Sequence, residues 1–185
     1  MTILGIAGSL RENSFNRSLI DAAADLVPDG VELKTFDLAG LPFYNQDLDA
    51  DGRRPEPVLE FARAIRQADA VLIATPEYNH VIPGVLGNAL DWASRSLGGT
   101  PPLRDKPVAV VGASPGMVGT ARAQDHLKLI LMVVGARVLG GRGVLLASAG
   151  SKIRDGVLED DTARRLTADL LRRLTDSAHA LREAA

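Results

Sequence analysis

The sequence predicts a doubly wound α/β fold: a five-stranded parallel sheet with helices on both faces. Two observations predict it. Short apolar runs alternate with helical stretches along the chain, and several of these runs are apolar at consecutive positions. Strands that are apolar on both faces are covered by helices on both sides, and alternating β and α units imply parallel strands. With 185 residues, the chain is expected to form a single domain, residues 1–185.

The expected elements follow one another regularly. Apolar runs predict strands at 3–7, 70–75 and 108–113, an alternating pattern predicts one at 31–37, and a fifth is expected within 137–146. Helices are expected at about 16–27, 57–68, 84–94 and 119–134, and from about residue 160 onward. With five strands, the expected order is flavodoxin-like, 2-1-3-4-5.

Composition limits the chemistry. The 21 Lys and Arg residues and 23 Asp and Glu residues give a net charge of −2, without the basic excess of a duplex-binding protein, so no nucleic-acid partner is expected. The chain has no cysteine, which excludes disulfides, thiolate metal sites and a cysteine nucleophile. His80, His126 and His179 are too scattered for a metal motif, so no metal is expected. Redox chemistry would therefore depend on a bound organic cofactor.

The beginning of the chain is apolar but soon reaches Arg11 and has no basic segment, so no signal peptide is expected. No apolar run approaches the roughly 20 residues of a membrane span. We therefore expect a cytoplasmic protein that does not bind a membrane.

Ligands of such sheets bind beyond the carboxyl ends of the strands, which directs attention to the loops after strands 1, 3 and 4. The first loop, residues 8–16, matches neither common nucleotide motif. It places Ser9, Arg11, Ser14 and Asn16 before a helix, whose unpaired N–H groups and positive end suit a phosphate. Arg11 would add charge-assisted hydrogen bonds to the phosphate oxygens. The alternative is ordinary capping by Ser14 with a solvated Arg11.

The second loop contains Pro76, Glu77, Tyr78 and Asn79. An amide can bind the polar edge of a heterocycle, and an aromatic ring supplies stacking area. The alternative is a simple turn, because proline and asparagine both favour turns.

Together these loops resemble the NADPH-dependent FMN reductase family, which includes bacterial chromate, quinone and azo-dye reductases. The resemblance rests on Gly8-Ser9-Leu10-Arg11 with Ser14 and Asn16, and on Pro76-Glu77-Tyr78-Asn79. Residues 81–95 resemble the helix that follows in the family, and the match extends from residue 3 to about 134.

The resemblance implies FMN as cofactor and NADPH, or NADH, as co-substrate, with no catalytic side chain because the flavin carries the chemistry. It implies that Ser9, Arg11, Ser14 and Asn16, with Phe15 beside them, bind the FMN phosphate. Pro76, Glu77, Tyr78 and Asn79 would lie along the ribityl chain and ring edge. Backbone groups of Ser114 and Gly116 would border the pyrimidine end.

The expected function is an NAD(P)H-dependent oxidoreductase that passes hydride to FMN and then to quinones, azo compounds, free flavin or chromate-type acceptors. Aromatic residues make up 4% of the chain, and the third loop, 114–119, has none. One face of the ring would thus stay open to nicotinamide. The alternatives are a non-enzymatic FMN electron carrier or redox sensor, and a phosphate-ester enzyme or nucleotide-binding module without flavin.

The segment 41–47 combines apolar, aromatic and acidic residues in a long connection, and such connections are usually functional. The resemblance implies that it reaches a partner subunit near the flavin, in a homodimer or homotetramer. The alternative is a surface flap. A role of His80 or His126 in proton transfer stays open, since a lone histidine near a loop is more often a surface or hydrogen-bonded residue.

Overall fold

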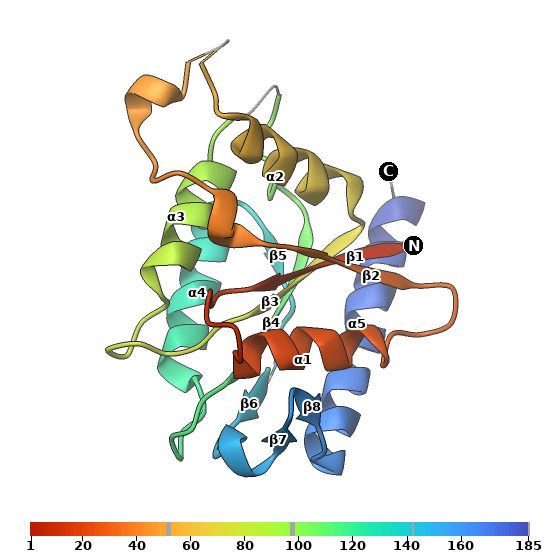
Figure 1. Ribbon diagram of the computed structural model, residues 1–185. Coiled ribbons are helices and arrows are strands. Elements are labelled where there is room, and N and C mark those ends of the chain that lie inside the picture. The colour runs from red at the N-terminus through yellow and green to blue at the C-terminus, as the bar shows by residue number, and fades with distance from the viewer. Residues whose placement is uncertain (51–52, 97–98, 142, 185) are drawn as a thin grey trace.

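A computed structural model describes residues 1–50, 53–96, 99–141 and 143–184. Its central sheet is parallel and has the order β2-β1-β3-β4-β5, as Figure 1 shows. The expected strand order 2-1-3-4-5 is thereby confirmed. The strands of this path are β1 (Thr2–Ala7), β2 (Glu32–Phe36), β3 (Ala70–Ala74), β4 (Pro107–Ala113) and β5 (Arg137–Val138).

The fifth strand differs from the expectation, because two short strands replace it. Both β5 and β6 (Val144–Leu146) pair with β4, β5 at its start and β6 at its end. Glycines at 140, 141 and 143 lie between them, and glycine weakens a strand interior. A Cβ atom at Gly143 would lie 2.5 Å from the carbonyl oxygen of Val110, so the backbone passes β4 more closely than any side chain would allow.

The expected helices are all present, with ends shifted by a few residues. They are α1 (Phe15–Ala24), α2 (Glu56–Gln67), α3 (Gly84–Ala93), α4 (Ala121–Val133) and α5 (Asp161–Glu183). Within the described ranges, no helix combines the length and the apolar character needed to cross a membrane.

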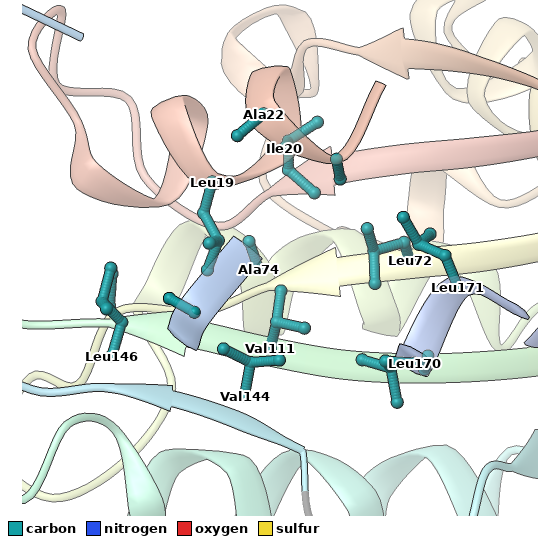
Figure 2. Close-up of a cluster of buried hydrophobic side chains, with 14 of the residues drawn as sticks. Leu19, Ile20, Ala22, Leu72, Ala74, Val111, Val144, Leu146, Leu170 and Leu171 are labelled. Atoms are coloured by element: carbon teal, nitrogen blue, oxygen red, sulfur yellow. The ribbon is translucent and has the colours of Figure 1, made fainter. Parts of the chain in front are cut away.

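The helices form a layer on each face of the sheet (Figure 1). On one face α1 and α5 pack against the strands, with Leu19, Leu72 and Leu171 in the same buried cluster (Figure 2). On the other face α2, α3 and α4 cover residues such as Val71 and Ile73. Successive residues of β3 therefore point into two different cores, which explains why the strand is apolar at every position.

A short hairpin between β6 and α5 was not expected. Its strands, β7 (Ile153–Arg154) and β8 (Val157–Leu158), are antiparallel and two residues long. Asp155 and Gly156 form the turn with φ angles of 47° and 82°, and Asp-Gly is a strong hairpin signal. Strands this short give no periodic pattern from which the hairpin could be predicted.

Candidate functional site

The loops after β1, β3 and β4 converge because their strands end side by side. Ala7 pairs with Ala74, and Ala74 pairs with Val111. Between these loops lies a cavity of about 260 Å³. Its lining is Ser9, Arg11, Ser14, Phe15, Asn16, Pro76, Glu77, Tyr78, Ala113, Ser114 and Pro115. The structure thus brings together the residues that the sequence singled out, apart from Asn79 and Gly116.

The first loop places two buried hydroxyls beside the start of α1. The Ser14 Oγ caps the helix and accepts hydrogen bonds from the backbone N–H groups of Asn16 and Arg17, at 3.3 and 3.4 Å. The Ser9 Oγ accepts one from the Arg11 N–H at 3.4 Å. Neither hydroxyl donates a hydrogen bond to another described residue, so each could donate one to a ligand. The guanidinium of Arg11 lies over the Phe15 ring, 5.0 Å from its centroid.

Asn16 joins the first loop to the third. Its Oδ1 accepts a hydrogen bond from the backbone N–H of Ala113, and its Nδ2 donates one to the carbonyl oxygen of Ala113, both at 2.9 Å. The side chain is buried. Half of the amide's hydrogen-bonding capacity, one N–H group and one oxygen lone pair, is therefore used inside the protein, at the point where β4 ends.

Glu77 joins the second loop to α4. Its Oε2 accepts a hydrogen bond from the Ala123 N–H at 3.1 Å, and its Oε1 lies 3.4 Å from His80 Nδ1 and 3.8 Å from the Arg122 guanidinium. Thr120, the N-cap residue of α4, makes no side-chain capping bond. A carboxylate from another loop thus caps this helix, where its negative charge is favoured.

The environment of Glu77 favours its charged form. Burial, the largest single influence, raises the pKa of its carboxyl group. The hydrogen bonds from the Ala123 backbone, His80 and the Arg122 backbone, together with the charge of Arg122, outweigh burial and leave the pKa below its ordinary value.

Asn79 lies outside the cavity because it forms a tight turn. Tyr78 and Val81 exchange two backbone hydrogen bonds of 3.1 Å, and between them Asn79 and His80 have φ angles of 52° and 69°. Two consecutive positive values are typical of a type I′ hairpin turn. The turn presents Tyr78 at the edge of the cavity with 51% of its surface exposed.

The third loop uses several of its polar groups internally. The backbone N–H of Ser114 donates to the carbonyl oxygen of Leu146 at 3.0 Å, and its hydroxyl donates to that of Gly119 at 2.7 Å. In the described part of the chain, the N–H of Gly116 has no such partner. Of the two backbone donors expected here, Gly116 is therefore the one that a ligand could still use.

A second recess of about 270 Å³ adjoins the first and shares Glu77, Ser114 and Pro115 with it. Its other lining residues are Gly116, Met117, Val118, Gly119 and Arg122. The sequence did not single out Met117, which lies in the third loop, or Arg122, which lies in the first turn of α4. Together the two recesses fall within the usual range of small-molecule sites, about 300–1,000 Å³.

The chemistry of this site suits FMN. A phosphate would find two hydroxyls, one guanidinium and the positive end of α1 at the first loop. A flat ring would find proline, tyrosine and backbone surfaces between the second and third loops.

Comparison with known proteins agrees with this geometry. Residues 1–151 match the family model of NADPH-dependent FMN reductases. An NAD(P)H-dependent FMN reductase of Pseudomonas aeruginosa is 44% identical over 173 residues, which cover 93% of this chain and 92% of that protein. A 2-hydroxy-1,4-benzoquinone reductase of a Burkholderia species is 48% identical over 69% of this chain and 68% of its own.

Among solved structures, a flavoenzyme NAD(P)H:(acceptor) oxidoreductase from Paracoccus denitrificans has a TM-score of 0.86. It is 34% identical, and the alignment covers 97% of each chain. These findings confirm the resemblance seen in the sequence, with FMN as cofactor and NAD(P)H as reductant, and the chain belongs to the NADPH-dependent FMN reductase family.

Proposed function

We propose that this protein reduces quinones with NAD(P)H, and that azo compounds, free flavin and chromate-type oxyanions are further acceptors. The observation that carries the proposal is the joined pair of recesses, one suited to a flavin and the other open beside it. The quinone reductase among the relatives supports this acceptor class. We place the enzyme in the cytoplasm, with residues 1–185 acting as one domain.

Each loop has a distinct role in this proposal. Ser9, Ser14, Arg11 and the first turn of α1 bind the phosphate, with Phe15 supporting the Arg11 guanidinium. Pro76 and Tyr78 would border the ring, and the Gly116 N–H would be available to its polar edge. Bound FMN supplies the acceptance of hydride from nicotinamide and its transfer to the acceptor.

Asn16, Glu77, Asn79 and Ser114 act mainly by positioning. Asn16 fixes the first loop to the end of β4, and Glu77 fixes the second loop to α4. Asn79 provides the turn conformation that presents Tyr78, and Ser114 holds the third loop closed through Gly119. The second recess receives nicotinamide first and the acceptor afterwards.

We further propose a homodimer or homotetramer in which the segment 41–47 approaches the flavin of a partner subunit. Phe43 in this segment is 84% exposed. Its neighbours are fixed, because the Pro42 carbonyl accepts hydrogen bonds from Asn88 Nδ2 at 3.0 Å and Trp92 Nε1 at 2.9 Å, and the Tyr44 N–H donates to Asn88 Oδ1 at 2.7 Å. An exposed aromatic ring on a segment that is anchored on both sides is well suited to an interface.

Anaerobic stopped-flow mixing with NADPH, and separately with NADH, tests the enzymatic function. The flavin absorbance of the yellow holoenzyme is expected to bleach and to return when a quinone is added. A flavin that neither nucleotide bleaches would instead indicate an electron carrier or sensor, and a protein that takes up no FMN would indicate a nucleotide or phosphate-ester site.

Replacing Arg11 with alanine is expected to weaken FMN binding by about 10- to 100-fold, because a hydrogen bond between charged groups contributes about 1.5–3 kcal/mol. Titration of the apoprotein with FMN, followed by fluorescence quenching, measures this. Arg17→Ala is the matched control, since Arg17 pairs with Asp37 at 3.4 Å and does not line the flavin cavity. Equal affinity in the Arg11 variant and the parent would contradict the assignment.

Glu77→Gln is expected to destabilise the protein at pH 7 by about 1 kcal/mol, the usual contribution of a helix cap. The folded-state pKa of Glu77 lies below its ordinary value. Its stabilisation is thus fully present above the ordinary pKa and is lost as the pH falls through the lowered one. Urea unfolding of the variant and the parent should be measured from neutral pH into acid. The difference between their free energies of unfolding should shrink as the pH falls. Glu12→Gln, an exposed change in the first loop, is the control, and a deficit independent of pH would argue against the cap.

Phe43→Ser is expected to reduce the sedimentation-equilibrium mass of the holoenzyme and its turnover per flavin. Val157→Ser, which changes an exposed apolar residue of the β7–β8 hairpin, is expected to alter neither. A parent protein that sediments as a monomer would refute the subunit contact.

A further inference from the structure

A separate recess of about 260 Å³ lies at the opposite edge of the sheet, where β3 and β4 begin. It is lined by the residues preceding these strands and by the C-terminal ends of α2 and α5: Arg66, Ala68, Asp69, Arg104, Asp105, Lys106, Pro107, Ala178, Leu181 and Arg182. In Figure 1 this edge is marked by the start of β1 and the end of α5, which lie side by side. Ligands of open α/β sheets bind at the other edge, so the flavin site does not account for this recess.

Positive charge exceeds negative charge in the recess. Its lining includes four cationic side chains and two carboxylates, although the whole chain has a net charge of −2. Both carboxylates already have partners. Asp69 pairs with Arg182 and accepts the Thr2 N–H at 2.7 Å, and Asp105 pairs with Arg137 at 3.2 Å. The charges of Arg66, Arg104 and Lys106 therefore have no carboxylate partner within the described residues.

Lys106 is the half-buried member of this group. Its ammonium donates to the carbonyl oxygens of Ala68 at 2.5 Å and Arg66 at 3.4 Å, which lie at the end of α2. Burial lowers the pKa of Lys106, the nearby Asp69 opposes this, and Arg182 lowers the pKa further. Asp69, the carboxylate that acts on Lys106, already pairs with Arg182, so the half-buried ammonium is only partly compensated, which is costly. An anion in the recess would complete that compensation.

The two exposed arginines have donors to spare. Arg66 makes a single side-chain bond, from Nη2 to the Thr100 carbonyl at 3.2 Å. The Arg104 side chain has no hydrogen-bond or ion-pair partner in the described part of the chain. Guanidinium groups bind phosphate oxygens in pairs. At about 30 Å³ per water, a recess of this volume has room for a group as large as pyrophosphate.

We propose that this recess binds the phosphate or diphosphate group of a small anion, independently of the flavin, with Lys106, Arg66 and Arg104 as its ligands. The bound anion joins the ends of α2 and α5 to the starts of β3 and β4. Its source is either free polyphosphate or the diphosphate of a nucleotide.

Isothermal titration calorimetry of the FMN-loaded holoenzyme with pyrophosphate tests this, in phosphate-free buffer at fixed ionic strength. The loaded flavin keeps its own phosphate site filled, and flavin absorbance verifies that it stays bound. We expect saturable binding of one pyrophosphate per chain and a higher melting temperature. ADP binding more tightly than pyrophosphate would assign the source to nucleotides, and the reverse order would assign it to free polyphosphate.

Arg104→Ala and Lys106→Met are each expected to weaken pyrophosphate binding at least tenfold. The matched control is Arg63→Ala, which removes a charge from the same helix as Arg66 but outside the recess. Because Arg104 is exposed, its variant decides the question even if Lys106→Met does not fold. Absence of saturable binding, or equal weakening in Arg63→Ala and Arg104→Ala, would overturn the proposal.

Discussion

The site depends on two polar side chains, the buried Asn16 and the partly buried Glu77, that fix three loops to one another. The sheet brings the ends of β1, β3 and β4 together, but it does not determine the shape of the loops that follow. Asn16 binds both backbone groups of Ala113, so the first loop and the end of β4 form one unit. Glu77 caps α4 in place of Thr120, so the second loop and the helix after the third loop form another unit.

Removing the side chain of Asn16 or Glu77 would leave backbone groups without partners, which costs about 1–3 kcal/mol each where they are buried. The same bonds keep the cavity in shape before any ligand enters.

The sequence was sufficient for the existence of the helices and of the central strands, because these depend on apolar patterns, and the strand order follows from the flavodoxin-like arrangement expected for five strands. Leu72 and its neighbours Val71 and Ile73 enter different cores, and this is why β3 is apolar throughout. The break between β5 and β6 follows from close backbone contact at Gly143, which depends on how near two strands come and not on any local pattern. The β7–β8 hairpin has strands of two residues, too short for a period to be recognised.

For the site, the sequence could identify which loops converge but not which way each polar group points. Asn16 is a reasonable phosphate ligand from its place at the start of a helix, yet its amide bonds a residue 97 positions away. Glu77 similarly bonds the backbone of Ala123, 46 positions away, and the Ser114 N–H bonds Leu146. These partners become neighbours only through strand pairing. Ser9, Ser14 and Arg11 could be placed more directly, because their surroundings are the start of the helix that they precede.

The two edges of the sheet differ in how they can attract an anion. At the carboxyl edge α1 begins, and the positive end of its dipole follows the loop that contains Arg11. At the amino edge α2 and α5 end, and helix ends present carbonyl oxygens, which repel anions. The Lys106 ammonium donates to such a carbonyl at the end of α2 and offsets its partial negative charge. Attraction at this edge therefore depends on side-chain charge alone, chiefly on the exposed Arg66 and Arg104, and exposed charges are screened by salt. Binding there should weaken with ionic strength more steeply than FMN binding, which also uses fixed backbone donors and buried hydroxyls.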